Sequence, residues 1–280
     1  MKKLLNFTIS LSNYCFGQTL KFETKYFDAV NKWIAFDKKD DDSTYIFGFI
    51  YIDEQAGFTF DYDSRFKIIN NKLEKLPNEI ESSIKSRLSP NTAHIHILNT
   101  EEIKQLDLPS EPDWLKHYKK NENEVSYLTK IGYHYNHVGA INNAIKPLLE
   151  AYKIEPNYEG LEFELAYAYN ATKNHEKAIE ILTKAIENDS KNFWYLRELG
   201  FAYKNLGQLD KAEETYKKGI ALSDDKNQKA EMSINMTQSY LQTKNKEKFD
   251  EWAKITLQYA EKNSQFERYI ESWTNNWEKK

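Results

Sequence analysis

The sequence predicts an α+β N-terminal domain followed by an all-α solenoid of helix-turn-helix repeats that ends in a capping helix. Three observations carry this prediction. Apolar and polar residues alternate through much of residues 19–118, they recur at helical spacing in the second half, and the second half matches itself after a shift of 34 residues. A chain of 280 residues has room for one large or two modest domains.

Residues 1–18 have the pattern of a secretory signal peptide. Lys2 and Lys3 give a basic start, residues 4–16 are mostly apolar, and Cys15 with Gly17 forms a small-x-small cleavage pattern. The alternative is a half-buried first strand, because polar residues alternate with apolar ones in the same stretch. The first interpretation is favoured and predicts a periplasmic or secreted protein, whereas the second fits a cytoplasmic one.

The N-terminal domain, residues 19–118, is expected to contain a β-hairpin. Residues 45–52 are apolar on both faces, and residues 53–57 supply a turn. In the second strand an alternating pattern is expected to place four aromatic side chains on one face: Phe58, Phe60, Tyr62 and Phe66.

Other short elements surround the hairpin. They are expected in this order: a strand over 29–36, a helix capped by Asn78 and bearing Ile80, Ile84 and Leu88, a strand over 93–98, a helix starting at Asn99 or Thr100, and a short helix over 114–118. The mixed order of elements predicts the α+β class.

Charge and cysteine content exclude several function classes. Lys and Arg total 39 and Asp and Glu total 43, so the chain lacks the basic surplus that nucleic-acid and anionic-membrane binders carry. The one cysteine allows neither an intrachain disulfide nor a cysteine-based metal cluster. The sequence also has no run of about 20 apolar residues that could span a bilayer.

The sharpest enzyme-like feature is a pair of histidines in the N-terminal domain. His94 and His96 share one face of a predicted strand, as Asp61 and Asp63 share a face of theirs. If these two strands paired, four metal ligands would converge. The alternative is that alternating polar residues line a solvated sheet face, and this alternative is favoured, so we predict no catalytic residue, metal or cofactor.

A 34-residue repeat organises the second half. Shifting the sequence by 34 residues aligns three sets of small or aromatic residues: Tyr135, Tyr169 and Tyr203; Gly132, Ala166 and Gly200; Ala144, Ala178 and Ala212. Within each unit the apolar residues follow i, i+3, i+4, i+7 spacing, so each unit is expected to be a helix pair.

These columns resemble the tetratricopeptide repeat (TPR), whose pattern sets large, small, aromatic and closing Pro residues at fixed places. The unit 125–158 carries all eight: Leu128, Ile131, Gly132, Tyr135, Ala144, Leu148, Ala151 and Pro156. The units 159–192 and 193–226 match less fully. The second has Glu162 at the first large position and Ser190 in place of Pro, and the third has Asp224 in place of Pro.

The repeats decay toward the C-terminus. Residues 230–263 are expected to form a fourth, degenerate pair, since the register slips after Asp224. Residues 265–280 are expected to form a capping helix with one apolar stripe: Phe266, Tyr269, Ile270, Trp273 and Trp277.

The resemblance implies that the inner face of the first helices binds a partner peptide or protein. By register, the expected contact residues are Tyr133, Asn136, Phe163, Tyr167, Asn170, Trp194, Arg197, Phe201 and Lys204. The resemblance also implies that acidic C-terminal tails are not ligands, because the positions of the family's two-carboxylate clamp hold Thr129, Tyr133, Glu164, Trp194 and Glu198.

We therefore expect a non-catalytic protein-binding or scaffolding protein with a protein or peptide partner, without nucleic-acid binding and without a membrane span. Two alternatives stay open. The chain's own N-terminal domain or tail helix could fill the groove, or the N-terminal domain could act as an enzyme or as a small-ligand or metal-binding domain with the repeats as a targeting module.

Overall fold

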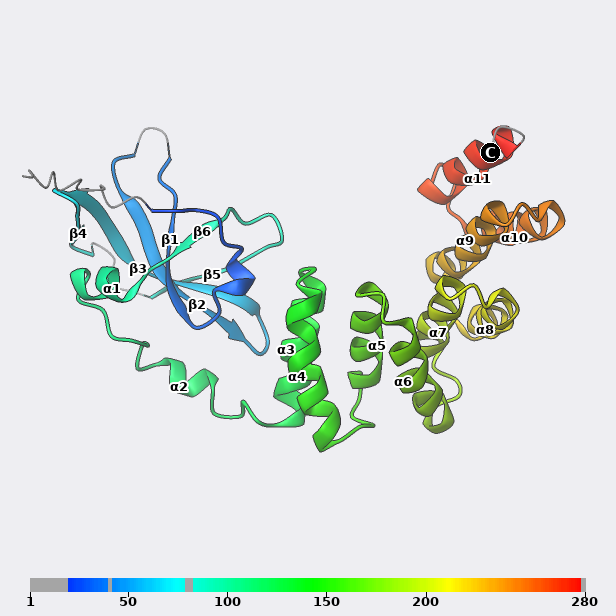
Figure 1. Ribbon diagram of the computed structural model, residues 1–280, viewed down its shortest axis with the longest axis horizontal. Coiled ribbons are helices and arrows are strands. Elements are labelled where there is room, and N and C mark those ends of the chain that lie inside the picture. Colours follow the sequence, from blue (N-terminus) through cyan, green and yellow to red (C-terminus); the bar gives the residue numbers. More distant parts are fainter. Residues whose placement is uncertain (1–19, 40–41, 79–82, 278–280) are drawn as a thin grey trace, which may run out of the picture. The chain divides into compact units, whose positions relative to one another are not determined.

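The computed structural model describes residues 20–39, 42–78 and 83–277, and the predicted signal peptide lies outside them. The chain divides into two compact units, residues 1–116 and 117–280 (Figure 1). The first unit is rich in strands and the second consists of helices, as the sequence predicts. None of the helices in the described ranges is both long enough and apolar enough to cross a membrane.

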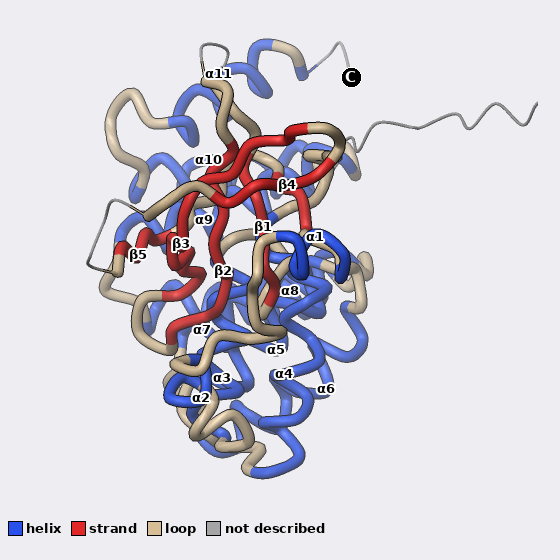
Figure 2. The backbone as a smooth tube through the Cα atoms, turned by 90° about the vertical axis from the view of Figure 1, so that its left-hand side faces the viewer, coloured by secondary structure: helices blue, strands red, loops and turns tan. Residues whose placement is uncertain are grey.

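The first unit is built around one antiparallel sheet whose strands run side by side in Figure 2. A 3-10 turn at Tyr26–Asp28 precedes β1 (Lys32–Phe36), β2 (Tyr45–Asp53), β3 (Gly57–Ile69), β4 (Lys72–Lys75), β5 (Ile84–Arg87) and β6 (Ile95–Ile97). In the described ranges the strand order is β4-β3-β2-β1-β6, and β5 also pairs with β3. Two short helices follow, α1 (Thr100–Gln105) and α2 (Leu115–Tyr118).

The predicted hairpin is confirmed as β2 paired with β3. The Asp53 carboxylate accepts hydrogen bonds from the backbone N–H groups of Gln55 and Ala56, which closes the turn. Gly57 then adopts φ +80°, a left-handed conformation that residues with a Cβ disfavour.

The prediction that four aromatic residues of β3 share one face is wrong for Phe66. Tyr62 is opposite Gly48 and Ser64 is opposite Phe47, so Asp63 is an extra residue in β3 and forms a bulge. Alternation restarts in the opposite phase after the bulge. Phe58 and Phe60 therefore face one side of the sheet, and Phe66 faces the other side, where its ring contacts Phe47.

The side of the sheet that Phe66 faces is covered by the chain segment before α2. Trp114 makes edge-to-face contacts with Phe49 and Tyr51, and the Trp33 indole donates a hydrogen bond of 2.8 Å to the Pro109 carbonyl. Phe47, Phe49 and Tyr51, which alternate along β2 and face this side of the sheet, are all buried.

The helix expected after Asn78 is also wrong over its described part. Residues 84–87 form β5, which pairs with residues 59–62 of β3; residues 79–82 lie outside the described ranges. The free edge of β3 offers backbone hydrogen-bond partners to this segment. Lys85 also places its ammonium 4.7 Å from the centre of the Trp114 ring.

The helix predicted to start at Asn99 or Thr100 is confirmed as α1. Asn99 is the N-cap and forms a capping box with Glu102, whose carboxylate accepts the Asn99 backbone N–H. Glu102 is 2% exposed, and its carboxylate also meets Nε2 of His96 at 2.9 Å. Gln105 at the end of α1 accepts the backbone N–H of Leu73 and so joins the helix to β4.

The second unit consists of antiparallel helix pairs in sequence (Figure 1). The pairs are α3 (Val125–His137) with α4 (Ile141–Ile154), α5 (Leu161–Ala171) with α6 (His175–Asn188), α7 (Phe193–Asn205) with α8 (Leu209–Leu222), and α9 (Lys226–Gln242) with α10 (Lys246–Tyr259). Helix α11 (Gln265–Asn275) closes the series.

Small residues in the repeat set the distance between paired helices. A Cβ on Gly200 would lie 2.6 Å from the Tyr216 ring, so the first helix can approach the second only without a side chain there. Each pair turns at a residue with positive φ, at Gly139, Lys173, Gly207 and Lys244. The first three are 34 residues apart, and the last interval is 37 because α9 is longer than α7.

Candidate functional site

Aromatic side chains follow one another along the first helices of the repeats. Phe163 and Tyr167 of α5 stack with ring centres 6.4 Å apart, and Phe163 meets Trp194 of α7 edge-on at 5.7 Å. Tyr133 of α3 and Trp194 are 44% and 38% exposed. We call Tyr133, Phe163, Tyr167 and Trp194 the aromatic row. Two large rings thus remain accessible on a face where the packing of the repeats does not require them.

Asn136 and Asn170, two of the predicted contact residues, form hydrogen bonds within the solenoid. The Asn136 amide donates to the backbone carbonyl and the carboxylate of Glu164, at 3.0 and 2.8 Å. One repeat later, Asn170 donates to the same two groups of Glu198, at 3.0 and 2.9 Å. Both asparagines are buried. Their amides therefore hold each repeat to the next, and Asn136 also lines a cavity of about 240 Å³.

Arg197 is the centre of a charged cluster beside the aromatic row. Its guanidinium donates to the Glu198 carboxylate at 2.8 and 3.1 Å and to the Gln228 side chain at 2.7 Å, and it lies 3.9 Å from Glu231. It also lies 4.7 Å from the centre of the Trp194 ring. Because its side chain is only 13% exposed, Arg197 chiefly orients Trp194 and neutralises nearby carboxylates.

Lys204 and Phe201 lie at the next step of the same face. The Lys204 ammonium is 5.2 Å from the centre of the Phe201 ring and donates to side chains of α9. Burial lowers the pKa of Lys204. Phe201 packs partly against the core of the last repeats. Both predicted contact residues are thus less accessible than Tyr133 and Trp194.

Two of the five clamp positions on this face, Glu164 and Glu198, hold carboxylates. Burial raises the pKa of Glu164, and the negative charge of Glu198 adds to that effect while the hydrogen bond from Asn136 opposes it. Burial also raises the pKa of Glu231, and Arg197 opposes that rise. An acidic peptide at this face would therefore lie near carboxylates.

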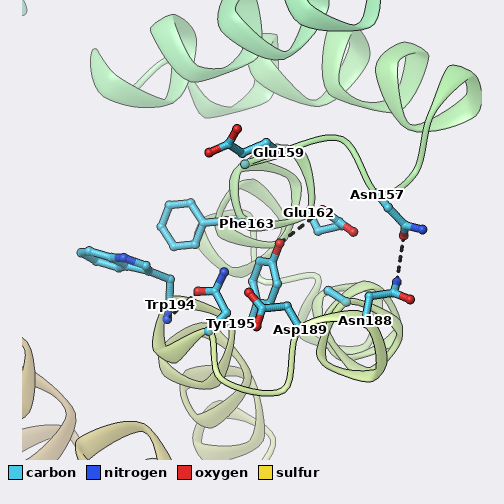
Figure 3. Close-up of a pocket in the computed structure, with 11 residues that line it drawn as sticks. Asn157, Glu159, Glu162, Phe163, Asn188, Asp189, Trp194 and Tyr195 are labelled. Atoms are coloured by element: carbon cyan, nitrogen blue, oxygen red, sulfur yellow. Dashed lines mark hydrogen bonds between the residues drawn. The ribbon is translucent and has the colours of Figure 1, made fainter. Parts of the chain in front are cut away.

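Two cavities flank Phe163. The smaller one, of about 240 Å³, lies between α3, α5 and α7, and the residues that line it include Tyr133, His137, Tyr167 and Arg197. The larger one, of about 510 Å³, lies where the first turns of α5 and α7 meet the end of α6 (Figure 3). The sequence does not predict the larger cavity, although Glu162, one of its residues, departs from the TPR pattern.

The tail helix does not fill this face. Helix α11 packs on α9 and α10, where Ile270 is buried and Trp277 contacts Phe249 with ring centres 4.8 Å apart. Four members of its predicted stripe pack toward that core, and the fifth, Tyr269, is 49% exposed. Helix α11 therefore caps the last repeat.

The possible metal ligands of the N-terminal unit do not come together. His96 lies on β6 and Asp61 and Asp63 lie on β3, with β1 and β2 between those strands. Asp61 accepts a hydrogen bond from Ser83, and Asp63 pairs with Lys75 at 2.6 Å. The described ranges contain no group of three or more potential ligands placed to hold a metal ion. The strand pairing on which this alternative depended is thus wrong.

Two family models described as tetratricopeptide repeat match the chain, over residues 163–192 and 181–214. Solved structures with a similar fold include MamA, at 23% identity over 52% of this chain and 84% of that one, with a TM-score of 0.46. Another is TTC0263, a thermophilic TPR protein of Thermus thermophilus, at 21% identity over 58% and 87% of the two chains, with a TM-score of 0.48. None of the curated proteins matches the chain significantly.

The family models run from α5 into α8, the part of the chain that contains two helix pairs and close contacts such as Gly200 against Tyr216. TPR units are in general non-catalytic modules for protein interaction or scaffolding. Residues 163–214 therefore contain tetratricopeptide repeats, which lie in the C-terminal helical unit.

Proposed function

We propose that the protein works without catalysis and binds a segment of a partner protein along the aromatic row. The observation that carries this proposal is the exposure of Tyr133 and Trp194 on either side of Phe163, next to a cavity of about 240 Å³. Apolar side chains of the partner would enter between these rings. Aromatic residues are the commonest hot spots of protein interfaces because they bury a large area and lose little conformational entropy.

The surroundings of the row support a rigid binding surface. Trp194 contacts both the Arg197 guanidinium and, in an edge-to-face arrangement, the Phe163 ring. The Asn170–Glu198 hydrogen bonds fix α5 against α7, which carry most of the row. A rigid surface loses less conformational entropy on binding than a mobile one. Asn136 and Asn170 would therefore contribute by orienting the helices, without touching the partner.

A peptide selection tests the proposal. Random 12-residue peptides are selected on the full chain, and the affinities of the selected peptides are measured by fluorescence anisotropy. Truncating a hot-spot aromatic costs about 2 kcal/mol or more, which is about thirtyfold in the dissociation constant. We expect Trp194→Ala and Tyr133→Ala each to weaken binding by at least about tenfold.

Tyr269→Ala is the matched control, since Tyr269 is also an exposed aromatic but lies on the capping helix. It should leave the affinities unchanged, and all three variants should keep the wild-type circular dichroism and melting temperature. Peptides that bind the two row variants as tightly as wild type would refute the proposal. A collapse of the fold in Trp194→Ala would show instead that this face is part of the core.

A further inference from the structure

The larger cavity beside the aromatic row has an unusual lining. Aromatic rings of Phe163, Trp194 and Tyr195 share it with three acidic residues, Glu159, Glu162 and Asp189 (Figure 3). The other residues that line it, all within the described ranges, are glycine, alanine and asparagine, so no basic side chain balances the acids. The volume of about 510 Å³ is in the usual range for ligand pockets.

The cavity coincides with a departure from the packing pattern of the repeats. Glu162 occupies the column in which the neighbouring repeats have Leu128 and Leu196, and both leucines are buried. A leucine at 162 would fill space with apolar atoms. A glutamate instead brings a carboxyl group to the base of the cavity, at a cost in packing.

Glu162 is buried without a basic residue among those that line the cavity. It is 4% exposed, and the Tyr195 hydroxyl donates to it at 3.4 Å, which is long for an O–H···O hydrogen bond. Burial raises the pKa of Glu162, and hydrogen bonds from its own backbone N–H and from Tyr195 oppose that rise. The same environment raises the pKa of Tyr195 to about 12, through burial first and then through the charges of Glu162 and Asp189. The lining of the cavity is therefore acidic, with Glu159, Glu162 and Asp189 and no basic residue.

Helix ends do not reverse this sign. The first turns of α5 and α7 each bring about half a positive charge, and the last turn of α6 brings about half a negative one, so their sum is smaller than the charge of three carboxylates. The Arg197 guanidinium lies 4.7 Å from the centre of the Trp194 ring and 5.5 Å from that of the Phe163 ring, but it is paired with Glu198 and approaches Glu231. Its charge is thus already compensated by these two carboxylates.

The lining favours an organic cation over a metal ion. The described acids are not grouped closely enough to coordinate a metal. A guanidinium spreads its charge over a planar group that can stack on Trp and Phe rings while donating up to five hydrogen bonds to carboxylates and amide oxygens. An arginine side chain combines that head group with an apolar stem, which matches a cavity with both kinds of wall.

We propose that this cavity binds an arginine side chain of the partner, with Glu162 at its base and Asp189 and Glu159 at its rim. The assignment of that arginine to the partner rests on the proposed function, because the cavity shares Phe163 and Trp194 with the aromatic row. The arginine would then fix the register of the bound segment, while apolar side chains supply contacts farther along the row.

The test uses Nα-acetyl-arginine methylamide as the probe and the citrulline analogue, which has nearly the same shape without the charge, as its control. Nuclear magnetic resonance follows the Trp194 indole N–H and the backbone N–H of Gly160 in the full chain during the titration. We expect saturable shifts with the arginine probe and about tenfold weaker binding of the citrulline probe, as is typical of losing a charge-assisted hydrogen bond.

Two variants separate binding from folding. Glu162→Leu restores the packing residue of the other repeats and should abolish the shifts while the melting temperature stays the same or rises. Glu162→Gln keeps a hydrogen-bond acceptor for Tyr195. It should weaken binding of the arginine probe to the affinity of the citrulline probe. Glu176→Gln, an exposed position on α6 outside the cavity, is the control and should bind as wild type does.

Equal binding of the two probes, or no saturable shift with the arginine probe, would overturn the inference. These outcomes are distinct from failure of the proposed function. Selected peptides that depend on Trp194 but show no arginine preference would leave the proposed function standing and overturn only the inference. If the shifts were specific to arginine but the selected peptides bound Trp194→Ala as tightly as wild type, the arginine could not be assigned to the partner. The proposed function would then be overturned as well.

Discussion

The hydrogen bonds between repeats predict that Asn170 contributes more to stability than Asn136, its equivalent one repeat earlier. Asn170→Ala removes one hydrogen bond to a buried backbone carbonyl and one to the Glu198 carboxylate. The first contributes about 1 kcal/mol and the charge-assisted one about 1.5 to 3 kcal/mol, so the free energy of unfolding should fall by about 2 to 3 kcal/mol. Arg197 still binds Glu198 in the variant, which keeps the loss at the lower part of the summed range.

Asn136→Ala should destabilise less, although Asn136 makes the same two hydrogen bonds one repeat earlier. The Oδ1 atom of Asn170 lies 3.2 Å from Nδ1 of His175, whereas the buried Oδ1 of Asn136 has no donor in the described part of the chain. Truncating Asn136 therefore also removes an unsatisfied acceptor, which offsets about 1 kcal/mol or more of the loss.

The assay is urea unfolding of the full chain, followed by circular dichroism at 222 nm, with the midpoint and slope compared among variants. Asn142→Ala, at an exposed position of α4, is the control and should change stability by less than about 0.5 kcal/mol. A loss below that value for Asn170→Ala, or a larger loss for Asn136→Ala than for Asn170→Ala, would refute the reasoning.

Two further predictions concern packing and pH. Gly200→Ala places a Cβ 2.6 Å from the buried Tyr216 ring, so the free energy of unfolding should fall by about 1 to 3 kcal/mol. The same urea titration measures this loss. An unchanged midpoint would mean that the ring can move aside. Burial raises the pKa of Glu213, but hydrogen bonds from Lys217, Tyr240 and Lys248 dominate and lower it to about 2. A lowered carboxylate pKa gives stability that is present above its ordinary value of 4.5 and is lost as the pH falls toward 2. In Glu213→Gln the melting temperature should therefore fall less steeply over that pH range than in wild type. Glu214→Gln is the control, because Glu214 forms an exposed pair with Lys218, and it should have a smaller effect on that fall. Equal pH profiles of the melting temperature for wild type and Glu213→Gln would contradict the prediction.

Local patterns in the sequence predict most of the elements. The hairpin and the helix pairs follow from alternation and from 3.6-residue periodicity, which depend on near neighbours in the chain. The helix α1 follows from the Asn99 cap. The strand β5 does not, since its segment has helical spacing and becomes a strand only because β3 offers a free edge. The position of Phe66 is missed for a related reason, because a bulge at Asp63 reverses the alternation.

The aromatic members of the candidate site are also predictable, but the use of its polar members is not. The repeat register predicts Tyr133 and Trp194 for the inner face, and both side chains are exposed. The same register places Asn136 and Asn170 on that face, yet their amides reach the next repeat. Short polar side chains bind whatever acceptor lies within about 3 Å, and that neighbour is set by helix packing.

The sequence by itself determined the repeat, its helix pairs and the row of aromatic residues, because each depends on a period that is written along the chain. Only the tertiary structure decided which polar groups pair across repeats and where space remains. The cavity above Glu162 shows the difference. In the sequence, Glu162 is visible only as a departure from the repeat pattern. Whether neighbouring side chains fill the space beside it depends on how three helices and two loops pack together.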